Sequence, residues 1–220
     1  MRQNLSAAVL ASLLYASGSA LHAQESSFLI VPRVGVMRQA LPFTQQFLLA
    51  PDFRSKWRYE MDAAPVIGAL IEVPTPLKSL VVRLEASQAG RSDIRKAEGS
   101  DGPPTYGDVT AEIQIATIAA VFQPPRFCRI SVCPRLVGGG GVKKYKFTGN
   151  LLWDDIVDRF ADDQSHTTLQ VGAGIVGYVS RLAIIVEVMD YSNAINFASR
   201  DQPTSRTHDV SLNLGAGVRF

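Results

Sequence analysis

The last fourteen residues constrain this chain more than any other stretch. From Asp209 to Phe220 the sequence alternates strictly between residues that are polar or small and apolar residues. The apolar positions are Val210, Leu212, Leu214, Ala216, Val218 and Phe220. A period of two predicts a β-strand with one apolar and one polar face. The chain closes on an aromatic residue of the apolar face, which is unusual for a soluble protein because its termini usually fray in water.

The amino-terminal segment predicts export. Arg2 precedes a largely apolar stretch from Leu5 to Ser17, and Leu21-His22-Ala23 comes directly before Gln24. This is the layout of a secretory signal peptide, and we expect cleavage between Ala23 and Gln24. A membrane anchor is the weaker interpretation, since a spanning helix needs about 20 apolar residues. The prediction is a signal peptide at residues 1–23 and one mature domain at 24–220.

Composition narrows the class of protein. Hydrophobic residues make up 46% of the chain, which is too low for a helical membrane protein but suits strands that are apolar at every second residue. The formal net charge is only +2. A nucleic-acid partner would require a basic patch, so we expect none.

Eight candidate strands follow the signal peptide. They cover about residues 28–37, 57–73, 80–90, 108–122, 136–147, 168–178 and 182–191 and the terminal run. The phase of the fifth is blurred by the four glycines Gly138 to Gly141. Short connections alternate with long ones, and this is the layout of a barrel with turns at one rim and loops at the other.

The two faces of these strands predict opposite surroundings. The apolar face includes the odd positions from Trp57 to Val73, and Val109, Ala111, Ile113, Ile115 and Val121 on the fourth strand. The polar face predicts a lumen network of both charges, formed by Arg33, Arg58, Glu60, Asp62, Glu72, Arg83, Glu85, Glu112, Glu187 and Arg219.

An eight-stranded barrel is just wide enough for side chains to fill its lumen. A mid-bilayer Arg or Lys on the lipid face would cost about 2–4 kcal/mol. Lys143 breaks the pattern unless it lies near a rim. A soluble exported barrel, with its apolar residues inside, is the alternative.

Together these features resemble a known family. The signal peptide, the eight strands, the alternating connections and the terminal Leu-Gly-Ala-Gly-Val-Arg-Phe resemble the small outer-membrane β-barrels, such as the transmembrane domain of outer membrane protein A. The resemblance covers the whole mature chain. It implies an all-β, eight-stranded antiparallel up-and-down transmembrane barrel in the cell outer membrane, with both termini in the periplasm.

The resemblance also implies partners. These are outer-membrane lipid, lipopolysaccharide and, through the carboxy-terminal strand, the outer-membrane barrel assembly machinery. We expect a monomer without a peptidoglycan-binding domain.

Cys128 and Cys133 lie in one turn between the fourth and fifth strands. In an oxidising periplasm they are expected to form a disulfide. A metal site would need two further ligands, and no histidine is near in sequence.

The mature chain offers little that suggests catalysis. Some barrels of this size are lipid A deacylases or acyltransferases, and such deacylases carry a His-x-Ser pair on one strand. Here His166 is followed two residues on by Thr168, and His208 by Val210. We therefore predict no catalytic residue, no cofactor and no metal, with both histidines at a rim.

Two long connections carry distinctive residues. Residues 151–163 combine a spacing typical of an amphipathic helix with five aspartates. These aspartates form a solvated face or bind cations that bridge lipopolysaccharide phosphates. The first connection is unusually apolar, with Phe43, Phe47, Leu48, Leu49 and Phe53. It covers the barrel mouth or contacts a partner or lipid headgroups.

The predicted role is structural or surface-interactive, with specificity in the extracellular loops. One alternative is a narrow channel for small solutes or ions. The other, which the residues favour less, is a lipid A-modifying enzyme.

Overall fold

The computed structural model describes residues 28–39, 43–50, 53–96, 109–128, 131–149, 164–195 and 205–220. Side chains are placed in residues 28–39, 61–94, 110–128, 131–148, 165–193 and 207–220. The predicted signal peptide, its cleavage site and the aspartate-rich segment 151–163 lie outside the described residues.

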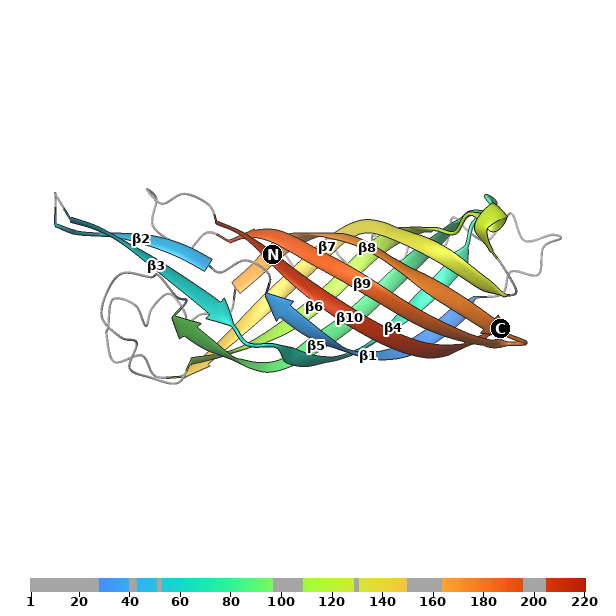
Figure 1. The fold of residues 1–220 in the computed structure, drawn as a ribbon, viewed down its shortest axis with the longest axis horizontal. Coiled ribbons are helices and arrows are strands. Elements are labelled where there is room, and N and C mark those ends of the chain that lie inside the picture. The colour runs from blue at the N-terminus through green and yellow to red at the C-terminus, as the bar shows by residue number, and fades with distance from the viewer. Residues whose placement is uncertain are drawn as a thin grey trace, which may run out of the picture.

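Eight strands close into an antiparallel barrel, as the sequence predicts (Figure 1). They are β1 (Leu29–Gln39), β4 (Ala64–Pro74), β5 (Leu80–Lys96), β6 (Val109–Phe122), β7 (Val132–Gly149), β8 (Gln164–Val179), β9 (Leu182–Ile195) and β10 (Ser205–Arg219). Each strand pairs with its neighbours around the wall, and the pair of β1 with β10 closes it.

The closing contact involves the end of the chain. The Phe220 N–H donates to the Phe28 carbonyl oxygen at 3.0 Å. The rings of the two residues stack with their centroids 5.0 Å apart. The apolar residues of β10 point outward, and Leu212 is 57% exposed, whereas Ser211 and Asn213 between them are buried. The alternation read from the sequence is therefore the alternation between the outer surface and the lumen.

Cross-strand register fixes the tilt of the strands. Cross-strand partners can be followed once around the barrel, starting at Val218 of β10. They lead to Ile30 of β1 and then, strand by strand, to Ser192 of β9. The path returns to β10 at His208, ten residues from where it began. A stagger of this size in eight strands corresponds to a tilt of about 40° from the barrel axis.

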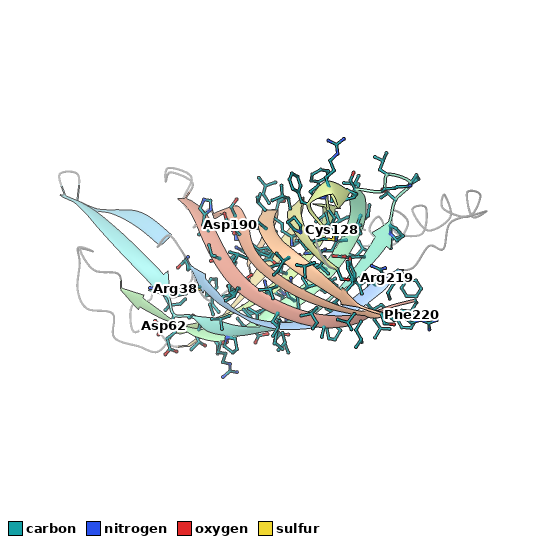
Figure 2. All side chains as sticks on the ribbon, turned by 45° about the vertical axis from the view of Figure 1, so that its right-hand side comes forward. Arg38, Asp62, Cys128, Asp190, Arg219 and Phe220 are labelled. Atoms are coloured by element: carbon teal, nitrogen blue, oxygen red, sulfur yellow. A yellow bond between two sulfur atoms is a disulfide. The ribbon has the colours of Figure 1, made fainter. Side chains whose placement is uncertain are left out.

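The two rims differ. Short turns after β4, β6 and β8 lie at the end that holds the carboxy-terminus, at the right of Figure 1. One of them contains the 3-10 helix η1 (Pro125–Phe127) and the Cys128–Cys133 disulfide. The longer connections lie at the opposite end. In the outer-membrane layout the short turns are periplasmic and the long connections extracellular. In Figure 2, Cys128, Arg219 and Phe220 lie toward the first end, and Arg38, Asp62 and Asp190 toward the second.

A hairpin of β2 (Phe43–Ala50) and β3 (Phe53–Met61) extends beyond the extracellular rim (Figure 1). The prediction of one strand from Trp57 to Val73, and of a loop before it, is therefore wrong. The chain leaves the sheet at Asp62–Ala63, where the Asp62 N–H donates to the Asp93 carbonyl oxygen. This break resets the alternation, so Met61, predicted to face lipid, is buried and only 5% exposed.

The phase of β6 is opposite to the prediction. Ala111, Ile113, Ile115 and Val121 are buried in the lumen. Glu112 points to the outer surface, where its Oε1 accepts a hydrogen bond from Gln88 Nε2 at 2.5 Å. The lumen beside β6 is apolar because these side chains pack against others such as Met37, Val66 and Met189.

Apolar side chains form the outer surface of the barrel. Ile67, Val171 and Leu169 are 63–64% exposed, whereas Arg83 and Lys143 are fully buried. A barrel in water would place these groups the other way round. The outer surface is thus a belt suited to hydrocarbon, with the charges enclosed. Within the described residues, no helix is long and apolar enough to cross a membrane.

Candidate functional site

The lumen contains a network of buried ion pairs. Its centre consists of Arg83 on β5, Arg135 on β7, Glu72 on β4 and Glu187 on β9. Arg83 donates to Glu72 Oε1 from Nε at 3.0 Å and from Nη2 at 2.8 Å. It also donates to both oxygens of Glu187, from Nη1 at 2.9 Å and from Nη2 at 2.6 Å. One guanidinium therefore joins two carboxylates from opposite sides of the lumen.

Arg135 binds the same two carboxylates. Its Nη2 forms a hydrogen bond with Glu72 Oε1, and its Nε lies 3.0 Å from Glu187 Oε1 as an ion pair. Gly174 provides space for this arrangement, because a Cβ there would lie 2.6 Å from Glu187 Cγ and 2.2 Å from the Val186 carbonyl oxygen. The glycine is thus required by the close approach of β8 and β9.

A second layer adjoins this centre. Glu85 Oε2 lies 3.8 Å from Arg83 Nη1, and Glu85 Oε1 accepts from Arg33. The same oxygen accepts from the Tyr191 hydroxyl at 2.5 Å, and Gln170 Nε2 donates to Oε2 at 2.9 Å. Both oxygens of the Glu85 carboxylate are thus held by donors from other strands.

A third layer lies nearer the extracellular rim. Lys143 Nζ lies 2.5 Å from Asp209 Oδ2 and 3.1 Å from the Tyr191 carbonyl oxygen. The Tyr145 hydroxyl donates to Asp209 Oδ2 at 3.0 Å. Lys143 therefore faces the lumen with a carboxylate partner, which resolves the apparent break in the lipid face noted from the sequence.

The buried charges balance. Among the described side chains, the buried charged groups are four cations, Arg33, Arg83, Arg135 and Lys143, and four carboxylates, Glu72, Glu85, Glu187 and Asp209. Removing charges from water costs several kcal/mol per ion, and the pairs offset this cost only while each keeps its partners. The network therefore fixes the relative positions of strands that are distant in sequence.

Apolar side chains close both sides of the network. Toward the periplasmic turns lies a cluster of Leu29, Val31, Leu70, Cys133, Val176, Ala183 and Ile185. Toward the extracellular rim, Met37, Met61 and Phe147 belong to the larger core cluster. A cavity of about 10 Å³ beside Gln39 and Asp209 has room for one water molecule at most. The described part of the lumen is thus packed rather than open.

The predicted lumen residues fall into four groups. Arg33, Glu72, Arg83, Glu85 and Glu187 meet in the network. Asp62 lies at the break between β3 and β4 and lines the small cavity beside Asp209, whereas Glu112 lies outside, so the prediction for Glu112 is wrong. Arg219 lies at the periplasmic mouth, with its Cζ 4.2 Å from the centroid of the Tyr178 ring. Arg58 and Glu60 are on β3, where side chains are outside the described set.

Sequence reasoning missed six members of the network, among them Gln170 on β8 and Tyr145 on β7. Arg135 and Lys143 are on β7, where the glycine run obscured the phase. Asp209 was treated only as part of the closing strand, and Tyr191 as the end of a strand. The alternation of β10 could have identified Asp209 as facing inward, because it shares the face of Ser211 and Asn213.

Other potential chemistry is sparse. Among the described residues, no group of three or more His, Cys, Asp or Glu side chains could hold a metal ion. His208 lies on the outer surface near the extracellular rim, and its Nδ1 is 2.8 Å from Asp190 Oδ2. His166 also lies near this rim, at a position of β8 that faces the lumen.

The closed antiparallel barrel, its apolar outer belt and its enclosed charges define a small eight-stranded outer-membrane β-barrel. A chain with this surface belongs in an outer membrane, because its belt is as apolar as the lipid that surrounds it.

Comparison with solved structures gives the same fold. The outer membrane protein OprG from Pseudomonas aeruginosa matches over 89% of this chain and 96% of its own, with a TM-score of 0.53 and 15% identity. Ail, the attachment invasion locus protein of Yersinia pestis, matches over 90% and 100%, with a TM-score of 0.44 and 14% identity. The outer membrane protease OmpT from Escherichia coli matches over 92% and 99%, with a TM-score of 0.40 and 7% identity.

The similarity to OprG, at 15% identity, supports the fold alone, and a fold does not determine the role of a protein. No protein-family model matches the sequence, and no curated protein matches it either.

Proposed function

We propose that this protein is a closed outer-membrane barrel that presents an interaction surface at its extracellular end. The observation that carries the proposal is the packing of the lumen. Arg83, Arg135 and Glu187 are at most 1% exposed, and apolar clusters lie on either side of them. A path for ions would require this network to separate, which would leave charges buried without partners.

The extracellular end supports the same proposal. The β2–β3 hairpin extends beyond the rim and is joined to the barrel through the pairing of β3 with β5, from Tyr59↔Lys96 to Met61↔Ile94. A hairpin anchored in this way is held by backbone hydrogen bonds on a rigid wall. Binding residues are commonly found on segments that such a scaffold positions.

Conductance separates this proposal from the channel alternative. The purified barrel is reconstituted in a planar bilayer at neutral pH and moderate salt. We expect no steady open current from the wild-type protein. A long-lived open state of constant conductance would overturn the closed-barrel part of the proposal.

Binding tests the surface role. A variant in which residues 43–60 are replaced by a short Gly-Ser turn retains all eight barrel strands. Cells that display the wild type or this variant are compared for adhesion to mammalian cell layers and for retention of serum proteins. We expect adhesion or retention with the wild type and its loss with the shortened hairpin. Equal behaviour of the two strains would contradict the assignment to this end of the barrel.

A further inference from the structure

Two side chains of the barrel wall hold the base of the β2–β3 hairpin. The chain leaves the sheet at Asp62–Ala63, between β3 and β4. Just before this break, the Met61 N–H donates to Gln39 Oε1 of β1 at 3.1 Å. At the break itself, the Ser92 hydroxyl of β5 donates to the Asp62 carbonyl oxygen. Gln39 and Ser92 are at most 8% exposed, so both contacts are shielded from solvent.

The contact with Met61 sets the orientation of the Gln39 amide. Because a backbone N–H can only donate, the amide oxygen must face Met61 and the amino group must point elsewhere. Gln39 Nε2 is buried, and it has no hydrogen-bond partner within the described part of the chain. A buried donor of this kind is costly unless something accepts a hydrogen bond from it.

Asp209 lies directly opposite Gln39 where β1 and β10 close the barrel. The two residues are Cα partners, and both side chains are buried in the lumen. Asp209 Oδ2 binds Lys143 and accepts from the Tyr145 hydroxyl, whereas Oδ1 has no hydrogen-bond partner among the described residues. One donor and one acceptor, both buried and lacking a described partner, are therefore found on neighbouring inward positions of adjacent strands.

The cavity of about 10 Å³ is lined by both of these residues. Asp62 and Ser92 belong to the same lining, so the space is polar and adjoins the base of the hairpin. Its volume is close to the smallest that holds one water molecule, and a buried water typically makes about three hydrogen bonds. A water here can accept from Gln39 Nε2 and donate to Asp209 Oδ1, which satisfies both groups at once.

The groups around the cavity favour a neutral occupant over an ion. Lys143 Nζ lies 2.5 Å from Asp209 Oδ2, so a metal ion at Oδ1 would lie near a second positive charge. The amino group of Gln39 carries hydrogens and no acceptor lone pair, so it cannot ligate a metal ion. An anion would face the Asp209 carboxylate. The occupant must therefore both accept and donate a hydrogen bond, and water does so in the smallest volume.

We propose that one water molecule binds between Gln39 Nε2 and Asp209 Oδ1, and that Gln39 is a positioning residue for the β2–β3 hairpin. The contacts lead from the Met61 N–H through the Gln39 amide and the water to Asp209, and from there to Lys143. The base of the hairpin is thereby joined to the charged network of the lumen. This link does not depend on the proposed function, because it exists whether or not the hairpin binds a partner.

A crystal structure of the mature barrel, at a resolution that shows ordered water, tests the water site. We expect one density peak within about 2.7–3.2 Å of both Gln39 Nε2 and Asp209 Oδ1. A direct hydrogen bond between the two side chains would overturn the proposal, and so would a cavity without density. An anomalous signal at this place would mean that an ion binds there, which would also overturn it.

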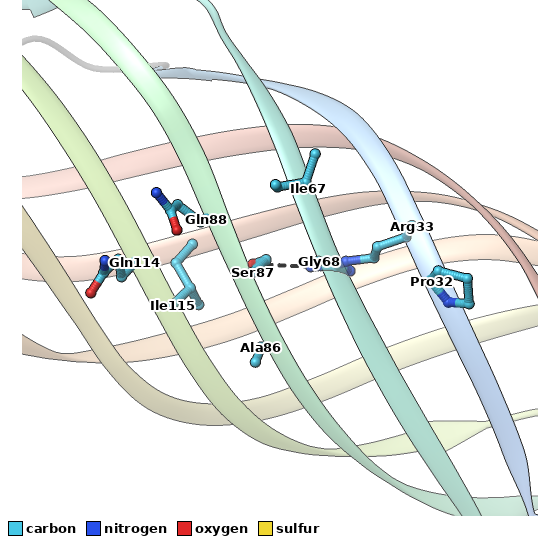
Figure 3. Close-up of a pocket in the computed structure, with 9 residues that line it drawn as sticks. All are labelled: Pro32, Arg33, Ile67, Gly68, Ala86, Ser87, Gln88, Gln114 and Ile115. Carbon is cyan, nitrogen blue, oxygen red and sulfur yellow. Dashed lines mark hydrogen bonds between the residues drawn. The ribbon is translucent and has the colours of Figure 1, made fainter.

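Two matched variants test the positioning role. Gln39→Met removes both the acceptor of the Met61 N–H and the donor to the water, while it keeps a side chain of similar length. Gln88→Met makes the same change on the outer face of β5, where Gln88 lies beside Gln114 at a different cavity (Figure 3). Folding of both variants is checked by the electrophoretic mobility of the unheated protein.

The position of the hairpin is measured by double electron–electron resonance in a Cys128→Ser, Cys133→Ser background. One pair of nitroxide labels, at Gln46 of β2 and Val171 of β8, spans the hairpin and the wall. A second pair, at Ile67 of β4 and Val171, spans the wall alone. We expect a narrow distance peak for both pairs in the wild type and in Gln88→Met. Gln39→Met should lose the narrow peak of the hairpin pair and keep that of the wall pair.

Two outcomes would overturn the positioning role. A hairpin peak that is equally narrow in Gln39→Met would mean that the hairpin is held without Gln39. Loss of both peaks would mean that Gln39 stabilises the whole barrel rather than the base of the hairpin. Neither outcome bears on adhesion, so this test can fail while the proposed function stands.

Discussion

Replacing Arg83 with Met tests the lumen network at its centre. The Arg83 guanidinium donates four hydrogen bonds, two to Glu72 and two to Glu187, all between 2.6 and 3.0 Å. Met fills much of the same volume but leaves both carboxylates with Arg135 as their shared cation. Breaking a buried ion pair by removing one partner costs about 3–5 kcal/mol. Because two pairs lose a partner at once, we expect a loss of about 5 kcal/mol in the free energy of unfolding.

The assay is urea unfolding of the barrel in lipid vesicles, followed by far-ultraviolet circular dichroism of the β-sheet. With a urea dependence of about 1–3 kcal/mol per molar, the midpoint should fall by roughly 2 M or more. Arg126→Met is the control, since Arg126 is exposed on η1 and its loss should change stability by less than about 0.5 kcal/mol.

A double variant examines the cause of this loss. Arg83→Met with Glu187→Gln restores the charge balance of the lumen, and it should recover part of the stability, with a coupling energy of about 0.5–3 kcal/mol. If Arg83→Met unfolded at the same urea concentration as the wild type, the inference that paired charges organise the lumen would be refuted.

Four further predictions use the same unfolding measurement or an insertion assay. Gly139→Ala should prevent insertion or strongly destabilise the barrel, because a Cβ there would lie 2.2 Å from the Ile118 carbonyl oxygen. Gly138→Ala should be tolerated, because a Cβ at Gly138 meets no atom within 4 Å. Equal insertion of the two variants would contradict this prediction. Glu112→Gln should change the free energy of unfolding by less than about 0.5 kcal/mol, because this side chain lies outside the lumen. A loss comparable to that of Arg83→Met would mean that Glu112 faces the lumen. Phe220→Ala should lower the free energy of unfolding by about 1 kcal/mol, because the ring stack with Phe28 is lost, and should slow insertion. An unchanged urea midpoint would count against a role of Phe220 in closing the barrel. Cys128→Ser should lower the free energy of unfolding by about 2 kcal/mol, the value expected for so short a disulfide loop. Circular dichroism should show that the barrel fold is intact.

Sequence alternation predicted the fold where one face of a strand is consistently apolar. On β10, residues that are polar or small alternate with apolar ones from Asp209 onward, and burial follows this pattern residue by residue to Val218. On β6 the lumen face is apolar at Ile113 and Ile115, and nearer the periplasmic turn the outer face is apolar too, at Ile118 and Phe122. Alternation places Glu112 opposite the apolar residues and so predicts it inside, but Glu112 lies near the extracellular rim, where the outer surface is polar. A period of two alone does not show which face of β6 points into the lumen, because the apolar outer belt ends partway along the strand.

The network was only partly predictable. Inward positions on β1, β4, β5 and β9 were identified from alternation, but their partners depend on the stagger of the barrel. Arg83 and Glu187 are separated by 104 residues, and only the register of every intervening strand brings them together. Arg135 follows a proline and precedes the glycine run, so its strand showed no readable phase. The break at Asp62–Ala63 was equally invisible, because odd positions remain free of charge on both sides of it.

The central claim is that hydrocarbon surrounds the sheet and the ionised groups face inward. Spin labels placed one at a time on successive residues of β10, from Val210 to Leu214, in a Cys128→Ser, Cys133→Ser background test it most directly. In lipid vesicles, the account predicts that relaxation by dissolved oxygen is high at Val210, Leu212 and Leu214 and low at Ser211 and Asn213. Uniform oxygen accessibility along the strand, or strong relaxation by a water-soluble nickel complex at Leu212 and Leu214, would contradict it.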